Sequence, residues 1–272
     1  MPHYTSKQVI DALWGPPPSA AKKSLEDLRK RVKPPEKPKG MTSGFNERLT
    51  SWKDFYRSHN LENYAQNLPE ELILSPKAEQ KIREAMEQGF DRMVFVPSVE
   101  LQLQSTDALI QEMANTPVSG LKDEENDQYG KHNKPYVDDT AKASTIRPNS
   151  RPSNQPYILL YQSAPIPQET KSKTYPQLEE LFKTKGWDGL TLQEYLLLQR
   201  LECETNHDHS FDAYNVTDAS KSNWSFLLDS QTPSGVVGAD WHPEDRRVSV
   251  HWYDSTGSRS PLGARPAVVV RL

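Results

Sequence analysis

The segment RRVSVHWYD near the C-terminus brings together several side chains that could make polar contacts with a ligand. Its apolar residues Val248, Val250 and Trp252 alternate with polar ones, and a period of two predicts a β-strand with the apolar set facing the core. The opposite face then carries a cation, a hydroxyl, an imidazole and a phenol, on Arg247, Ser249, His251 and Tyr253. Aromatic rings supply rigid contact area and small polar groups adapt their hydrogen bonds, so this mixture is typical of a recognition surface.

The alternation also has a simpler interpretation. Any antiparallel strand with one solvated face alternates in the same way, so the pattern by itself favours a plain exposed face over a binding surface. Only the motifs on either side of the strand distinguish the two interpretations.

Residues suited to catalysis or metal binding are sparse. Cys203 is the only cysteine, which excludes an intramolecular disulfide, a cysteine-based zinc cluster and a paired-cysteine redox site. His207 and His209 in NHDHSFD could share one face of a strand and bind a metal, but no third ligand has a defined spacing, so a solvated loop is favoured. No glycine-rich phosphate loop, nucleophile elbow or Ser/His/Asp pattern is evident. We therefore expect no enzymatic activity, no metal and no cofactor.

The composition restricts the partners. The chain has 272 residues and a net charge of −4, so no overall positive field favours nucleic acid or anionic membranes. The sequence lacks both a run of about 18 apolar residues and the apolar core of a secretory signal, so we expect neither a membrane span nor a signal peptide. The basic stretch from Lys22 to Lys39 is interpreted as a helix and an extended tether; the alternative is a site for nucleic acid or another anionic partner.

Start and stop signals predict the elements of the first half. Ser75 and Pro76 predict the beginning of a helix that Gly89 ends, and the apolar run DRMVFVP predicts a buried strand directly after it. Ser105 is expected to cap the next helix, whose inward side chains are Leu109, Ile110 and Met113. Upstream, four aromatic residues recur near helical spacing and predict a helix that packs through its aromatic face: Phe45, Trp52, Phe55 and Tyr56.

The second half begins with a polar, turn-rich stretch at 119–156, which predicts a long loop or insertion. YILLY and ARPAVVV predict central strands, and TYPQLEELFKTKG predicts an amphipathic helix that Gly186 ends. Thr191 and Glu194 have the spacing of a capping box, in which each side chain bonds the backbone amide of the other residue. The apolar helix that follows is expected to pack on a sheet.

The motifs GLTLQEYLLLQR, SNWSFLLDSQTPSG and GARPAVVV carry a family resemblance that covers 189–272. They resemble the C-terminal part of the variable proteins of diversity-generating retroelements, which have a C-type lectin fold similar to that of formylglycine-generating enzymes. The resemblance implies an α+β protein with mixed and antiparallel sheets and flanking helices, and the residue patterns upstream predict an N-terminal helical extension. The expected divisions are an extension at 1–61 and a lectin-like domain at 62–272, with a variable region at 238–260.

In such retroelements a reverse transcriptase rewrites adenines, commonly in Asn-type codons, and the residues so produced include Asp, His, Tyr, Ser, Arg, Gly and Thr. The resemblance thus implies a set of variable, ligand-binding positions, namely Asp240, His242, Arg246, Arg247, Ser249, His251, Tyr253 and Asp254. Further candidates are Asp245, Thr256, Gly257 and Ser258. An invariant scaffold would hold them in place, formed by Trp224, Trp241, Pro243, Val248, Val250 and Trp252.

The function that this resemblance implies is receptor-like recognition of a protein or cell-surface ligand, with display on a cell surface or virion. Formylglycine-generating activity is the enzymatic alternative, but it depends on cysteine chemistry and only Cys203 is present. Binding through diversified side chains needs a backbone that packing and ladder hydrogen bonds hold fixed, because only then can the surface change without unfolding the protein.

Overall fold

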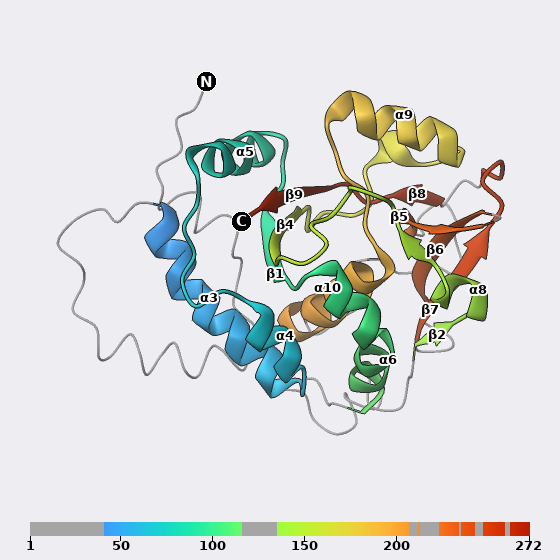
Figure 1. Cartoon of the computed structure of the whole chain (residues 1–272). Coiled ribbons are helices and arrows are strands. Elements are labelled where there is room, and N and C mark those ends of the chain that lie inside the picture. Colours follow the sequence, from blue (N-terminus) through green and yellow to red (C-terminus); the bar gives the residue numbers. More distant parts are fainter. Residues whose placement is uncertain are drawn as a thin grey trace. The chain divides into compact units, whose positions relative to one another are not determined.

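The computed structural model describes residues 41–115, 135–206, 212, 223–233, 235–242, 247–258 and 262–272 (Figure 1). The fold is α+β, with antiparallel and mixed sheets and flanking helices. Contacts divide the described residues into two compact units. Of the described residues, those up to Gln102, Pro152–Tyr161 and Val269–Leu272 belong to unit 1, and those within Leu103–Arg151 and Gln162–Val268 belong to unit 2.

Unit 1 begins with three helices, which are α3 (Met41–Ser58), α4 (Glu62–Asn67) and α5 (Pro76–Glu87). The predicted aromatic face of α3 is confirmed, since Phe45, Trp52, Phe55 and Tyr56 are all buried. The α5 signals are confirmed too: the Ser75 hydroxyl accepts the Ala78 amide at 3.2 Å, and Gly89 has the left-handed φ of 89° that suits glycine after a helix. α3 lies in the same contact unit as α4 and α5.

A three-stranded sheet of order β1-β4-β9 completes unit 1, with β1 at Arg92–Val96, β4 at Tyr157–Tyr161 and β9 at Ala267–Arg271. β1 and β4 are antiparallel, and β4 is the central strand that YILLY predicts. The expectation that ARPAVVV is central is wrong, because β9 lies at an edge of this sheet. Packing nevertheless buries Val268, Val269 and Val270, and the Lys81 amine donates to the Val269 carbonyl at 2.8 Å. A lysine that covers an edge carbonyl shields the strand from unwanted pairing.

Unit 2 is built on a six-stranded sheet of order β2-β7-β6-β5-β3, with β8 paired to β5. The strands are β2 (Tyr136–Val137), β3 (Thr145–Ile146), β5 (Trp224–Thr232), β6 (Gly235–His242), β7 (Arg247–Tyr253) and β8 (Leu262–Ala264). The helical elements are α8 (Asp139–Lys142), η1 (Gln168–Thr170), α9 (Tyr175–Lys185) and α10 (Leu192–Asn206). α6 (Val99–Asn115) begins in unit 1 and continues into unit 2.

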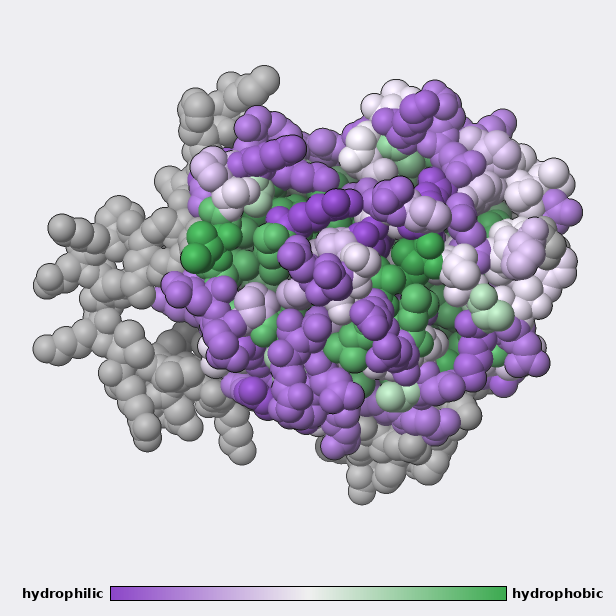
Figure 2. Space-filling view, in the orientation of Figure 1, coloured by the Kyte–Doolittle hydropathy of each residue, from purple (hydrophilic) through white to green (hydrophobic). Residues whose placement is uncertain are grey.

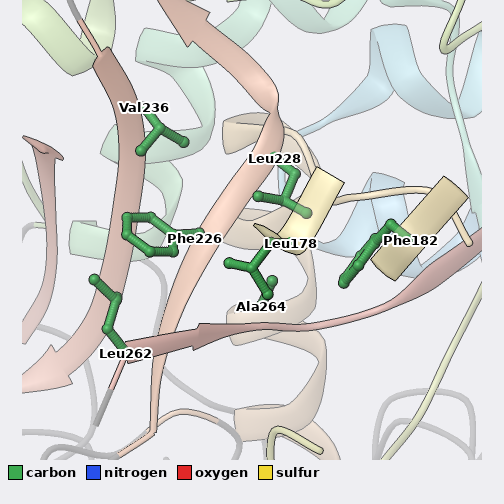
Figure 3. Close-up of a cluster of buried hydrophobic side chains, with 7 residues drawn as sticks. All are labelled: Leu178, Phe182, Phe226, Leu228, Val236, Leu262 and Ala264. Atoms are coloured by element: carbon green, nitrogen blue, oxygen red, sulfur yellow. The ribbon is translucent and has the colours of Figure 1, made fainter. Parts of the chain in front are cut away.

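One face of this sheet packs against α9. Leu178 and Phe182 of α9 meet apolar side chains from the strands in a buried cluster whose other members are Phe226, Leu228, Val236, Leu262 and Ala264 (Figure 3). The predicted end of α9 is confirmed, since Gly186 has a φ of 69°. The cluster anchors the helix to β5, β6 and β8, and so fixes the backbone of the strands next to the candidate site.

The start of α10 is fixed by the predicted capping box. The Glu194 amide donates to the Thr191 hydroxyl at 3.2 Å, and the Thr191 amide donates to the Glu194 carboxylate at 2.8 Å. α10 also contacts β5, where the Leu192 amide donates to the Ser230 hydroxyl at 2.8 Å. The expectation that this helix packs on a sheet is confirmed.

Two local expectations are wrong. The helix expected to be capped by Ser105 begins at Val99 instead, where the Gln102 amide donates to the Ser98 carbonyl, and its inward residues are buried as expected. The stretch 119–156 is not a simple loop in its described part, 135–156, because it contributes β2, α8 and β3. Strands of two residues carry no periodicity, so only their pairing with β7 and β5 reveals them.

Hydrophilic side chains cover most of the face shown in Figure 2, with hydrophobic areas between them. Large hydrophobic side chains that are exposed in the described residues include Ile73, Leu103, Tyr136 and Trp252. Among the described helices, none has the length and apolarity that crossing a membrane requires.

Candidate functional site

The register of β6 and β7 decides which side chains share a face. Asp240 pairs with Ser249, His242 pairs with Arg247, and Gly238 pairs with His251 in an antiparallel ladder. Directly paired residues project to the same side of a sheet, so the polar side chains of both strands gather on one face. We call this surface the polar face and define it as Asp240, His242, Arg247, Ser249, His251 and Tyr253. The period-two alternation of RRVSVHWYD is therefore confirmed.

The polar face has a buried floor and an accessible rim. Asp240 is 4% exposed and Ser249 is 5% exposed, whereas His242, Arg247 and His251 are partly exposed. The expectation that all variable positions are open to a ligand is thus wrong for Asp240 and Ser249. The two residues face each other in the β6–β7 ladder.

The apolar face is buried except at its end. Val248, Val250 and Trp241 are at most 7% exposed, as expected for a scaffold. The expectation that Trp252 is also buried is wrong, because its side chain is 43% exposed. Among the described residues, the pairing of β2 with β7 ends at Val250, so Trp252 lies past the part of β7 that β2 covers.

Tyr136 joins the polar face from a segment that the sequence patterns do not mark. β2 is parallel to β7 and places Tyr136 beside Ser249. The Arg247 guanidinium lies over the Tyr136 ring at 5.2 Å from its centroid, and the Tyr136 and His251 ring centroids are 5.2 Å apart. Tyr136 is 42% exposed, so this cation and two rings form an accessible group on a strand surface.

Asp138 holds β2 and α8 against β7. Its carboxylate caps α8 by accepting the Ala141 amide at 2.6 Å, and it accepts the Trp252 amide at 2.9 Å. The same carboxylate lies 3.9 Å from His251 Nδ1. An Asp directly before the first residue of a helix is an ordinary N-cap signal, and Asp138 in DDTAK has this position. Its contacts with β7 arise only in the folded protein.

Electrostatics differ between the floor and the rim. Burial, and secondly the charge of Asp212, raise the pKa of Asp240 to about 7, and its Oδ2 has no hydrogen-bond partner within the described ranges. Burial also lowers the pKa of His251, an effect that Asp138 opposes and that Arg247 and His242 reinforce. The floor carboxyl and the rim imidazole therefore both favour their neutral forms compared with the free side chains.

The remaining expected residues lie around this surface. Tyr253 contacts the α9 cluster, with ring centroids 6.0 Å from Phe226 and 6.4 Å from the half-buried Trp224. Asp254 is exposed, and hydrogen bonds from Thr256 lower the pKa of its carboxyl. Thr256, Gly257 and Ser258 are exposed. Pro243, Asp245 and Arg246 lie outside the described residues.

The sequence offers further candidates for metal binding, cysteine chemistry and anionic partners, and most of them lie outside the described residues. Within the part of the chain that the structure describes, no group of three His, Cys, Asp or Glu side chains could hold a metal ion. His207, His209 and the basic stretch from Lys22 to Lys39 lie outside the described residues, and Cys203 is part of α10.

Comparison with known proteins gives no relative. No protein-family model matches the sequence, and neither a curated protein nor a solved structure matches the chain. The geometry of the polar face is therefore the basis for a functional assignment.

Proposed function

We propose that this protein recognises a ligand through the rim of the polar face. The observation that carries the proposal is the grouping of Arg247, His251 and Tyr136 on two paired strands, with ring and guanidinium separations of 5.2 Å. Aromatic and Arg side chains contribute most to binding at many interfaces, because they offer large contact area with few degrees of freedom. The buried apolar side chains of β6 and β7 support the rim from the opposite face of the sheet, and the α9 cluster packs beside it on the same face.

The resemblance to the variable proteins of diversity-generating retroelements gives this proposal a finer form. We propose a C-type lectin-like scaffold whose rim residues His242, Arg247, His251, Tyr253 and Asp254 are diversified, and whose partner is a protein or a cell-surface molecule. Display on a cell surface or virion is part of the same proposal. Asp240 and Ser249 are left out of the proposed variable positions because both are buried. Substitutions at buried positions destabilise a fold far more than those at exposed ones.

A pair of display libraries tests the proposal. One library randomises His242, Arg247 and His251, and the matched control randomises Trp241, Val248 and Val250 on the opposite face. We expect most rim variants to stay folded, since exposed substitutions change stability by about 0.5 kcal/mol or less, and most control variants to lose the fold. Selection of the rim library on several unrelated purified proteins should yield binders to each.

Two outcomes would contradict the proposal. Equal loss of folded protein in both libraries would show that the rim is structural. A well-folded rim library that yields no binder to any of the proteins would show that this surface does not recognise ligands. The fraction of folded variants thus measures how well the fold tolerates rim substitutions, and the selection separately measures whether the rim binds ligands.

The retroelement origin has its own genetic test. A near-repeat of the DNA that encodes 238–272, differing only at adenines and lying beside a reverse transcriptase gene, is the expected finding. Differences at other bases, or the lack of any such repeat in the flanking DNA, would contradict this part of the proposal while leaving ligand binding open to the library test.

A further inference from the structure

Unit 2 contains a cavity of about 250 Å³ on residues distinct from the polar face. Its walls come from the turn after β3, from α9 and the residues that follow it, and from β5. The residues that matter for its chemistry are Arg147, Glu179, Phe182, Lys183, Trp187 and Asp229. This volume is slightly below the range of about 300–1,000 Å³ that is usual for small-molecule sites, so it suits a small ligand.

Three charged side chains of the cavity wall, Arg147, Glu179 and Asp229, belong to a network of five. Arg147 pairs with Glu179 at 2.7 Å and with Asp229 at 3.2 Å. Arg151 lies behind it and pairs with Glu194 at 2.6 Å and with Asp229 at 2.9 Å. Three carboxylates therefore share two guanidinium groups, which leaves one negative charge in excess.

Arg147 makes most of the hydrogen bonds in this wall, although its Nε has no hydrogen-bond partner within the described residues and lies 3.2 Å from the Asp229 carboxylate. Arg147 Nη2 donates to the Tyr175 hydroxyl, to Glu179 and to the Leu228 carbonyl, at 2.6 to 3.0 Å. Glu179 remains 38% exposed at the cavity, so its carboxylate can still accept from a bound molecule. At the mouth, Asp188 and Lys183 carry opposite charges that balance in number. The wall therefore favours a ligand that donates hydrogen bonds and carries a positive charge.

An aromatic wall completes the cavity. The rings of Phe182 and Trp187 meet edge to face, with centroids 5.6 Å apart. The Lys185 amine lies 5.2 Å from the Trp187 centroid, so this indole already has a cation beside it. Aromatic rings attract ammonium groups through their quadrupole and also pack against apolar carbon.

From the cavity, its excess negative charge and its aromatic wall, we propose that this is a second binding site, which takes a small organic cation. The ligand would be an amine or guanidinium compound with an apolar or aromatic part. The ammonium group would lie near Glu179 and the apolar part against Phe182 and Trp187. This site is independent of ligand recognition at the polar face, because the two surfaces share no residue.

Three probes of similar shape test the sign of the charge: benzylammonium, benzyl alcohol and benzoate, titrated into the full chain. Binding is followed at the indole N–H resonance of Trp187, which a Trp187→Phe variant assigns. We expect benzylammonium to shift this resonance at concentrations up to about 10 mM, and the other two probes to bind at least about fivefold more weakly. No shift with benzylammonium, or equal binding of benzoate, would overturn the proposal.

Charge variants with opposite expected effects separate a binding role from a structural one. Glu179→Gln should weaken benzylammonium binding roughly tenfold, because it removes a charged acceptor. Lys183→Gln should strengthen binding about twofold, because it removes a like charge from the mouth, where Lys183 has no ion-pair partner among the residues described. The matched control is Glu180→Gln, an exposed neighbour on α9 that does not line the cavity and should leave binding unchanged.

A thermal unfolding scan of each variant accompanies the titrations. If Glu179→Gln does not fold, Asp188→Asn replaces it and is expected to weaken benzylammonium binding in the same direction. Equal weakening by Glu180→Gln, or weakening by Lys183→Gln, would contradict the assignment of this cavity to a cation.

Discussion

At the scale of single residues, burial separates positions that look equivalent in the sequence. Asp240, Ser249 and His251 all lie on the polar face of β6 and β7. The first two form its buried floor, and the third forms part of its rim. A buried carboxyl without a hydrogen bond to Oδ2 is unusual, since buried polar groups generally have partners. Such a group destabilises the fold when it ionises, and this has a measurable consequence.

Asp240→Asn should change how stability depends on pH. The folded pKa of about 7 lies above the value of an unfolded Asp, so the folded state binds the proton more tightly and wild-type stability falls as pH rises from about 4 to 7. Asn cannot ionise, so the variant should gain roughly 4 kcal/mol over wild type at pH 8 compared with pH 4. Urea unfolding at both pH values measures the difference. Asp212, whose pKa is raised to about 6, also lowers stability as pH rises, but it does so in both proteins.

Asp254→Asn is the matched control for that measurement. Hydrogen bonds from Thr256 lower the pKa of the exposed Asp254, so its contribution to stability is present above the unfolded pKa and is lost as pH falls. The control should therefore show a small effect of opposite sign. A pH dependence of Asp240→Asn that parallels wild type would show that Asp240 is ionised in the folded protein across this range.

At the scale of elements, unit 2 joins its helices and strands through side chains from distant parts of the chain. Arg151, which follows β3, donates to both oxygens of Glu194 at 2.6 and 2.8 Å and to Asp229 of β5 at 2.9 Å. Its Nη2 also donates to the Gly189 carbonyl at 2.6 Å. Glu194 thus serves at once as the capping residue of α10 and as the partner of a buried guanidinium.

Replacing Arg151 with Met should strongly destabilise the protein. The change leaves Glu194 and Asp229 in buried positions without one of their cations, and such a break costs about 3–5 kcal/mol. The matched control is Arg57→Met, which removes exposed ion pairs with Asp54 and Glu62 and should cost about 1 kcal/mol or less. Urea unfolding measures both, and similar losses in the two variants would show that the buried network adds nothing special.

At the scale of the whole molecule, neither unit is a continuous stretch of chain. Unit 1 gathers its sheet from three separate segments, and the chain leaves it after Gln102 and again after Tyr161 before Val269–Leu272 returns. α3 contributes four buried aromatic residues to unit 1. These buried rings favour a helix that belongs to the core over one that forms an appended extension.

Shortening the chain distinguishes these two descriptions. A chain that begins at Glu62 lacks α3, and the loss of its aromatic packing should abolish cooperative unfolding of unit 1 or lower the midpoint by about 10 °C or more. A chain that begins at Met41 keeps α3 and is the reference for this comparison. Equal thermal midpoints for the two chains would mean that α3 is an independent appendage.

The sequence alone determined the local features, because caps, stop signals and periodicity act between residues a few positions apart. The Ser75 cap, the Thr191–Glu194 capping box, the glycines at 89 and 186 and the alternation along β7 are all of this kind. Only the tertiary structure decided the depth of Asp240 and Ser249, the exposure of Trp252 and the placement of Tyr136 beside Arg247. Those properties depend on which distant strand or helix packs over each side chain. Sequence periodicity predicts the face of the strand on which a side chain lies, but not what packs against that face.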